Sequence, residues 1–190
     1  MISIDKADYV LVAQLPLHCD NRKLEIAEQH AILFDFKNIF CDFFYAIQDN
    51  WESTEAPWLV LINGGQYNNC KGVDVTIQGL RIALAYLSYA RFTLGNPVTE
   101  TASGAVHKEA QFSIPVPLKD LQASSTKYRD MGMALIDEAR GFICSDREEA
   151  EFETYDFINC PDCGCDEHCE GEPKLSGFGL KSNTVTKKWE

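Results

Sequence analysis

The most constraining feature of this chain is the stretch of residues 75–94, in which apolar side chains occupy most positions. The polar side chains within it, chiefly those of Gln78, Arg81 and Ser88 together with Arg91, form only a narrow stripe. A helix that is apolar around most of its circumference must be surrounded by other elements. We therefore predict that it is the central helix of an all-α domain, a helical bundle with these leucines in its core: Leu80, Leu84, Leu87 and Leu94.

A second helical pattern extends over residues 21–48, and Asp20 or Asn21 can cap it. Apolar residues recur there at spacings near three and four, and aromatic residues are numerous enough to cover more than one face. At about 1.5 Å per residue, such a helix is roughly 40 Å long unless it breaks near residues 37–38.

Two shorter helices are predicted before the central helix. One covers residues 5–12, and Asp5 caps it. The other covers residues 54–63 with Thr54 as its cap, and Gly64 and Gly65 end it because glycine readily adopts a left-handed conformation. The residues between these glycines and the central helix are expected to form a loop. The second short helix is expected to bury three side chains: Leu59, Leu61 and Ile62.

The last predicted helix covers residues 118–143 and carries a seven-residue repeat. In this repeat large side chains alternate with small ones, and this alternation allows a neighbouring helix to approach closely, with a large side chain seated opposite a small one. The large residues are Leu121, Tyr128, Leu135 and Phe142, and the small ones are Ser125, Gly132 and Ala139.

Two segments are expected to lie outside the bundle. Residues 98–116 contain a Ser103–Gly104 pair, and this pattern predicts a projecting β-hairpin or extended loop. Residues 145–172 are rich in Asp and Glu and have few apolar residues, so they cannot form a core of their own. We therefore predict a helical domain over residues 1–144 and an acidic, cysteine-rich, extended C-terminal arm over residues 145–190. The arm is expected to become ordered only against neighbouring molecules, with three anchors: Phe152, Tyr155 and Phe157.

Composition limits the class of function. The net charge of −12 argues against general nucleic-acid binding, which requires clustered Lys and Arg. No segment reaches about 18 uninterrupted apolar residues, so no membrane span is expected. The amino-terminal residues lack the basic flank and apolar run of a signal peptide. The protein is therefore expected to act in the cell that makes it, or inside a particle assembled there.

Half of the eight cysteines lie in one short cluster near the C-terminus. Cys160 and Cys163 have the spacing of half a zinc site, and Cys165 with His168 or Cys169 supplies the other half. Structural zinc sites usually separate their two halves by about a dozen residues or more, and here the halves are adjacent. Zinc, free thiols in an acidic tail, and a disulfide-linked knuckle formed on oxidation all remain open. Reduced thiols or a metal site are favoured over a disulfide framework.

No motif predicts catalysis. The four histidines are scattered and lack a partnered nucleophile, and the chain has no phosphate loop or dinucleotide fingerprint. Gly64 and Gly65 lack the Lys-Ser/Thr that a phosphate loop requires. Arg81 and Arg91 lie on the central helix, where we expect them to neutralise buried acids or to reach a neighbouring subunit. We therefore do not expect an enzyme.

Several segments of the sequence are similar to those of one protein family. They are residues 61–65 (LINGG), 79–86 (GLRIALAY) and 89–92 (YARF), and residues 98–108, with Val98-Thr, Ser-Gly104, Val106 and Lys108. Tyr128 and the stretch 135–138 extend the similarity, which covers roughly residues 20–143. These residues resemble the head–tail adaptor, or connector ring, proteins of tailed bacteriophages of Bacteroides-type hosts, the crAss-like phages included. The similarity lies in packing and turn residues and carries no catalytic group.

The resemblance implies a structural virion protein of the phage neck, assembled in the host cytoplasm. Such a subunit forms a ring, twelvefold in this expectation, that joins the portal of the capsid to adjacent neck or tail ring proteins. The ring lines the DNA channel, and the DNA passes without specific binding. The loop after the central helix and the C-terminal arm are expected to reach neighbouring subunits or the next ring.

The alternative is a zinc-binding scaffolding or regulatory module that presents its cysteine-rich tail to a partner. The two hypotheses differ in what they require. A connector requires an exposed hairpin near Ser103 and Gly104 and assembles into visible rings. A zinc module requires one metal ion per chain and loses the order of its tail when a chelator is added.

Overall fold

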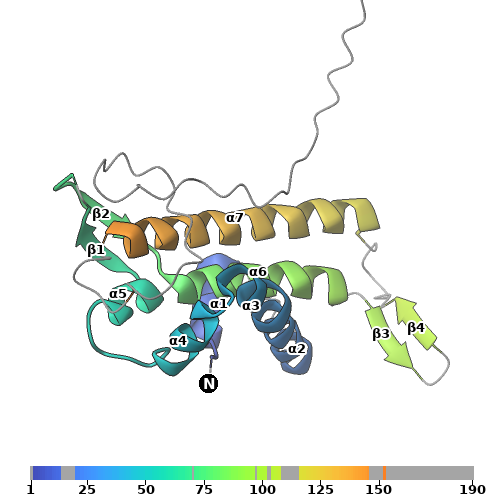
Figure 1. Ribbon diagram of the computed structural model, residues 1–190. Helices are drawn as coiled ribbons and strands as arrows, with labels where there is room; N and C mark the ends of the chain where they lie inside the picture. Colours follow the sequence, from blue (N-terminus) through green and yellow to red (C-terminus); the bar gives the residue numbers. More distant parts are fainter. Residues whose placement is uncertain are drawn as a thin grey trace, which may run out of the picture.

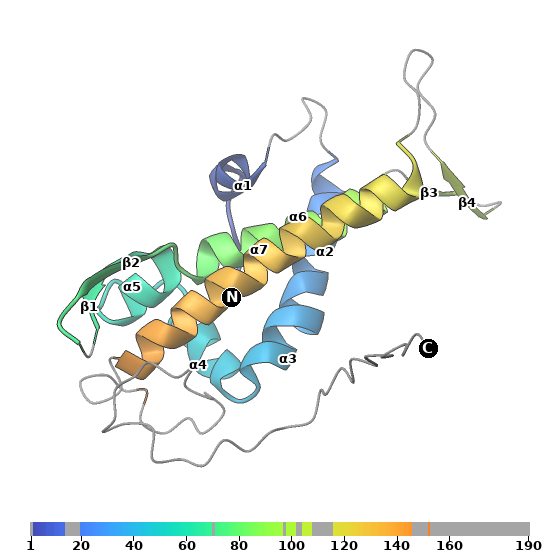
Figure 2. The same ribbon diagram turned by 90° about the horizontal axis from the view of Figure 1, so that it is seen from above.

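The computed structural model describes most of the chain as a helical bundle (Figure 1). Helix α6 (Leu80–Gly95) lies at the centre, and α7 (Leu118–Ser145) runs antiparallel beside it. Helices α1 (Lys6–Val12) and α2 (Asn21–Ala31) also contact α6, and Figure 2 shows α7 covering α6 from above. The helical bundle is therefore as predicted. The described residues are 2–13, 20–69, 71–96, 98–101, 104–107, 116–145 and 152.

The central helix begins later than predicted, because residues 74–77 belong to a β-strand. Strand β2 (Asp74–Ile77) pairs antiparallel with β1 (Gly65–Asn68), so the predicted loop and the helical start at residue 75 were both wrong. The alternation of Val75 and Ile77 suits a strand as well as a helix. Gly79 then turns the chain into α6 with a φ of 81°, a conformation open to glycine and rarely to other residues.

Gly64 and Gly79 lie backbone to backbone where the hairpin meets the bundle. A Cβ atom on Gly79 would overlap the Gly64 nitrogen and would lie 2.6 Å from the Ile62 carbonyl oxygen. Gly64 itself has a φ of 85°, so it ends the preceding helix as predicted. Two glycines therefore allow the β1–β2 hairpin to enter and leave the bundle at one point.

The core forms around α6. Leu80, Leu84 and Leu87 are buried as predicted, whereas Leu94 is 40% exposed and that prediction was wrong. Leu94 lies in the last turn of the helix, next to its final residue, Gly95.

Leu84→Ala is expected to lower the free energy of unfolding by about 2–5 kcal/mol, because it removes buried methyl groups and leaves a cavity. Leu84 has no exposed surface, so no rearrangement at the surface can fill the space. Leu94→Ala on the same helix is the matched control and should cost less than about 1 kcal/mol. Urea denaturation measures both values, and equal losses for the two variants would contradict this description of the core.

Helices α6 and α7 pack closely because small residues face the contact. Ser125, Gly132 and Ala139 are all buried, which confirms the predicted seam. An added Cβ at Gly132 would lie 2.9 Å from Cγ of Leu87, so the leucine side chain occupies the space that glycine leaves. The Ser125 hydroxyl donates a hydrogen bond of 2.8 Å to the carbonyl of Ala90, so this buried polar group has a hydrogen-bond partner within the contact.

The long helix predicted over residues 21–48 is divided into shorter pieces. After α2 the chain forms a π-helix, η1 (Ile32–Phe36), and then a short helix, α3 (Lys37–Phe40). The break comes at Cys41, which has a φ of 47°, and not near residues 37–38. Helix α4 (Phe43–Asp49) follows. The periodicity of the aromatic residues continues through the break, so it gave no sign of the turn.

The two short helices differ in how well their ends were predicted. Helix α1 has Asp5 as its N-cap, as predicted, and the Asp8 carboxylate accepts a hydrogen bond of 2.9 Å from the Asp5 N–H. Helix α5 (Trp58–Asn63) begins after Pro57, so the prediction of Thr54 as cap was wrong. Leu61 and Ile62 are buried as expected, but Leu59 is 39% exposed.

A second hairpin follows α6. Strands β3 (Val98–Thr101) and β4 (Gly104–His107) pair antiparallel, which confirms the hairpin predicted around residues 103–104. Figure 1 shows this hairpin at the end of the bundle opposite β1 and β2.

Phe152 lies beyond α7 and is inserted into an aromatic cluster of its own chain. Only 1% of it is exposed, and its ring centroid lies 5.0 Å from that of Trp58 and 5.7 Å from that of Phe43. Phe152 is therefore an anchor, as predicted, but its partner is the chain's own core and not a neighbouring molecule. Tyr155, Phe157 and the remainder of the arm lie outside the described residues.

Candidate assembly surface

Helix α2 and the π-helix η1 expose a ridge of apolar side chains, which we call the α2 ridge and define as Ile26, Leu33 and Phe34. These residues are 43%, 52% and 57% exposed. Ile26 lies seven and eight positions before Leu33 and Phe34, a spacing that places α-helical residues on one side, and the exposed Gln29 and His30 lie between them. Contiguous exposed apolar surface on a soluble protein marks an interaction site more often than an isolated apolar residue does.

The π-helix places neighbouring residues on opposite sides of the chain. Leu33 and Phe34 face the solvent, whereas Asp35 and Phe36 are buried. Single π-helical turns of this kind are frequent at functional sites.

Arg91 of α6 holds η1 in place. Its Nε and Nη2 donate hydrogen bonds of 2.7 Å and 3.0 Å to the two carboxylate oxygens of Asp35, a bidentate pair. The expectation that Arg91 neutralises a buried acid is therefore confirmed. The guanidinium carbon also lies 5.6 Å from the centroid of the Phe34 ring, and the His30 ring meets Phe34 edge-on at 5.6 Å. Phe34 is thus exposed and in contact with two neighbouring side chains.

Arg81 has a different role. It donates to Oδ1 of Asn63 at 3.0 Å, stacks over the Trp51 ring at 5.3 Å and forms an ion pair of 3.5 Å with Glu52. The Glu52 side chain is 72% exposed, so the expectation of a buried acid is not met here. Arg81 instead ties α6 to three segments of its own chain, because it also donates to the Ser3 carbonyl at 3.4 Å.

A cluster of titratable groups joins α1 to α2 and α6. Burial raises the pKa of the Tyr9 hydroxyl, and the nearby charge of Glu28 raises it further. Burial also raises the pKa of Glu28, whose Oε1 accepts a hydrogen bond of 3.1 Å from the Ile4 N–H. The Ser88 hydroxyl lies in the same cluster and is fully buried. Neither the Tyr9 hydroxyl nor the Ser88 hydroxyl makes a hydrogen bond of good geometry in the part of the chain that the structure describes. The cluster attaches the N-terminal segment to the bundle.

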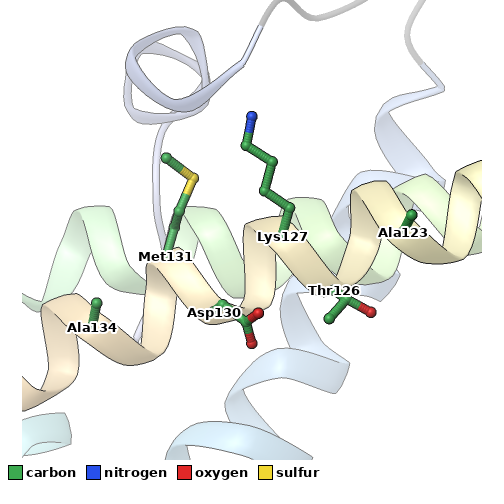
Figure 3. Close-up of a pocket in the computed structure, with 6 residues that line it drawn as sticks. All are labelled: Ala123, Thr126, Lys127, Asp130, Met131 and Ala134. Carbon is green, nitrogen blue, oxygen red and sulfur yellow. The ribbon is translucent and has the colours of Figure 1, made fainter.

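The outer face of α7 carries a shallow, open hollow (Figure 3). The described residues that line it all come from this one helix, and their side chains are exposed. Binding sites for small molecules are concave and are lined from several elements. This surface therefore does not resemble a catalytic pocket. Its lining residues are Ala123, Thr126, Lys127, Asp130, Met131 and Ala134.

The predicted metal ligands Cys160, Cys163, Cys165 and Cys169, with His168, lie outside the described residues. Within the described ranges, no group of three His, Cys, Asp or Glu residues is placed to hold a metal ion. Zinc binding by the cluster stays a prediction. Cys144, at the end of α7, is disulfide-bonded, whereas Cys41 is a free and exposed thiol.

Sequence reasoning did not identify the α2 ridge. The excess of aromatic residues between Phe34 and Tyr45, more than one helix face can bury, was the available signal. Among the described helices none is long and apolar enough to cross a lipid bilayer.

Comparisons with known proteins find no match among curated proteins or solved structures. One family matches residues 36–164, more than half of the chain. The match begins within η1 and includes α6, α7 and both hairpins, so Arg91 lies inside it and the α2 ridge lies just before it. The chain belongs to the family of unknown function DUF6712.

Proposed function

We propose that this protein is a structural subunit of a ring in the neck of a tailed bacteriophage, joining the portal of the capsid to the tail. The observation that carries the proposal is the α2 ridge, whose exposed Phe34 contacts the side chains of Arg91 and His30. An exposed aromatic side chain offers a partner a large apolar surface to bury. In an assembly of identical subunits, every copy presents the same surface to a partner.

The shape of the subunit also supports assembly. The β3–β4 hairpin stands at one end of the bundle, where a neighbouring subunit can reach it (Figure 2). Residues 98–108, which include the hairpin, also carry part of the resemblance to connector proteins. A head-to-tail contact repeated around an axis closes into a ring, for which we propose twelve copies.

The charge of the chain suits a channel for DNA. A net charge of −12 on each subunit repels the phosphate backbone, so the genome passes without sticking. In this proposal the partners are other copies of the chain, the portal protein and the adjacent neck or tail proteins. The site of action is the virion, and the subunits assemble in the cytoplasm of the host.

Imaging the purified protein by electron microscopy, alone and mixed with the portal protein of the same virus, tests the proposal. We expect closed rings that dock coaxially on the portal. Leu33→Asp places a charge on the α2 ridge and should abolish the rings or their docking, since a buried unpaired charge is costly. A wild-type protein that neither forms rings nor binds the portal would refute the function.

Val10→Asp is the matched control for Leu33→Asp. Val10 is 67% exposed and belongs to α1, which is not part of the ridge, so the change has the same chemistry at another exposed site. It should leave rings and portal binding unchanged. Loss of assembly in both variants would show that added charge, and not the ridge, is responsible.

A further inference from the structure

The two hairpins lie at opposite ends of one helix. Helix α6 has 16 residues; β2 ends just before it and β3 begins just after it. At about 1.5 Å per residue the helix separates the hairpins by roughly 24 Å. Figure 1 shows them at the two ends of the bundle. They therefore cannot pair within one chain, although all four strands have the same length of four residues.

The β1–β2 hairpin is fixed firmly to the bundle. The Tyr67 ring packs edge-on against Phe142 of α7 at 4.9 Å, and Ile77 is only 3% exposed. Partial burial raises the pKa of the Tyr67 hydroxyl. Together with the close contact of Gly64 and Gly79, these interactions make β1–β2 a rigid two-stranded sheet.

The register shows which backbone groups of this sheet point outward. Asn69 N–H donates to the Val73 carbonyl at 3.0 Å, next to the ladder that pairs Tyr67 with Val75. In an antiparallel ladder, hydrogen-bonded pairs alternate with pairs whose N–H and C=O groups face away. The outward groups therefore belong to the pairs Gln66–Thr76 and Asn68–Asp74. The side chains of all four residues are exposed, and among the described residues their outward backbone groups have no partner.

Among the described residues, the β3–β4 hairpin has little contact with the bundle. Within the described chain its two strands pair with each other and make no extensive contact with another helix or strand. A two-stranded hairpin alone is marginally stable in water and gains stability when it joins a larger sheet. Its sequence, with Val98, Thr99 and Val106, is rich in residues that favour strands.

We propose that the β3–β4 hairpin of one copy pairs with the outer edge of β1 in the next copy, forming a four-stranded sheet across the subunit boundary. This mode of binding uses main-chain hydrogen bonds from an exposed strand edge. The β3–β4 hairpin and the edge of β1 lie at opposite ends of the subunit. The contact is therefore head-to-tail, and every copy repeats it. The inference rests on the proposed ring and specifies how its subunits join.

The edge of β1 is favoured over that of β2 because of charge. Gln66 and Asn68 on β1 are uncharged, whereas Asp74 stands on the outer edge of β2. Charged side chains on an edge strand discourage pairing. The incoming hairpin also carries Glu100, which Asp74 would repel.

Two proline substitutions at one rung of the ladder test the proposal. Gln66→Pro removes an outward N–H from β1, and Thr76→Pro removes one from β2, directly across the sheet. Neither change removes a hydrogen bond between the two strands, and proline is tolerated where the N–H of an edge strand faces solvent. We expect Gln66→Pro to weaken self-association at least about tenfold and Thr76→Pro to change it less than about twofold. Sedimentation velocity measures the association.

Hydrogen exchange of the wild-type protein provides a second measurement that does not depend on the variants folding. The amides of Gln66 and Asn68 should exchange more slowly in the assembly than in dilute subunits, whereas those of Asp74 and Thr76 should not change. Unchanged exchange at β1, or a loss of association only in Thr76→Pro, would overturn the inference.

Electron microscopy separates the two proposals. Rings without protection of the β1 amides would overturn the shared sheet and leave the connector function standing. Open chains or dimers with protected β1 amides would overturn the ring and leave the shared sheet standing.

Discussion

Gly79→Ala is expected to lower the free energy of unfolding by about 3–5 kcal/mol, the largest effect of any single change considered for this protein. The new Cβ would overlap the backbone of Gly64 and would lie 2.6 Å from the Ile62 carbonyl oxygen. It would also force a residue with a side chain to hold a φ of 81°. The steric overlap and the unfavourable φ both involve backbone atoms, so no side-chain movement can relieve them. Urea denaturation followed by circular dichroism measures the loss.

Gly72→Ala is the control for backbone conformation alone. Gly72 has a φ of 70°, close to that of Gly79, but an added Cβ would meet no atom within 4 Å. It should cost only about 1 kcal/mol, the penalty for a left-handed alanine. If the two alanine variants lose equal stability, the close contact between Gly64 and Gly79 has no energetic role.

Deletion of residues 100–108 is expected to abolish ring assembly and leave a folded monomer. The deletion removes most of the β3–β4 hairpin, whose strands make no extensive contact with the described helices. The α6–α7 contact, with Leu87 seated on Gly132, stays intact. Circular dichroism should therefore show an unchanged helical content, and sedimentation velocity should show only monomers.

A control for the deletion keeps the length of the connection between α6 and α7. In it, residues 100–108 are replaced by Gly and Ser in equal number, and this variant should also remain monomeric. Rings formed by either variant would mean that the hairpin is not an assembly element, whichever strand edge it faces.

Regular periodicity in the sequence correctly predicted the parts of the fold that repeat over many residues. The apolar stretch around Leu84 gave the central helix, and the alternation at Ser125, Gly132 and Ala139 gave the close contact with α7. The Ser103–Gly104 pair predicted the second hairpin. For the two helices, burial of one continuous apolar face dominates the free energy, so a regular pattern in the sequence is enough to predict them.

The β1–β2 hairpin, the π-helix and the turn at Cys41 were not predicted. The alternation of Val75 and Ile77 is compatible with a strand and with a helix, and only pairing with β1 distinguishes the two. The π-helix and the turn at Cys41 interrupt an aromatic pattern that continues through both. Backbone contacts between distant residues decide such elements, and these contacts leave no periodic trace in the chain.

The sequence by itself therefore determined the central helix, its partner α7, the hairpin after it and the absence of a recognisable catalytic motif. Only the tertiary structure decided which apolar residues remain exposed. Helix α2 and η1 have apolar residues on more than one face, and α6 covers only the face of Leu24, Ala27 and Ala31. Arg91 then fixes η1 through Asp35 and leaves Phe34 in solvent. A helix with apolar residues on two faces exposes one of them when the bundle covers only the other, and which face is covered depends on the packing of the whole bundle.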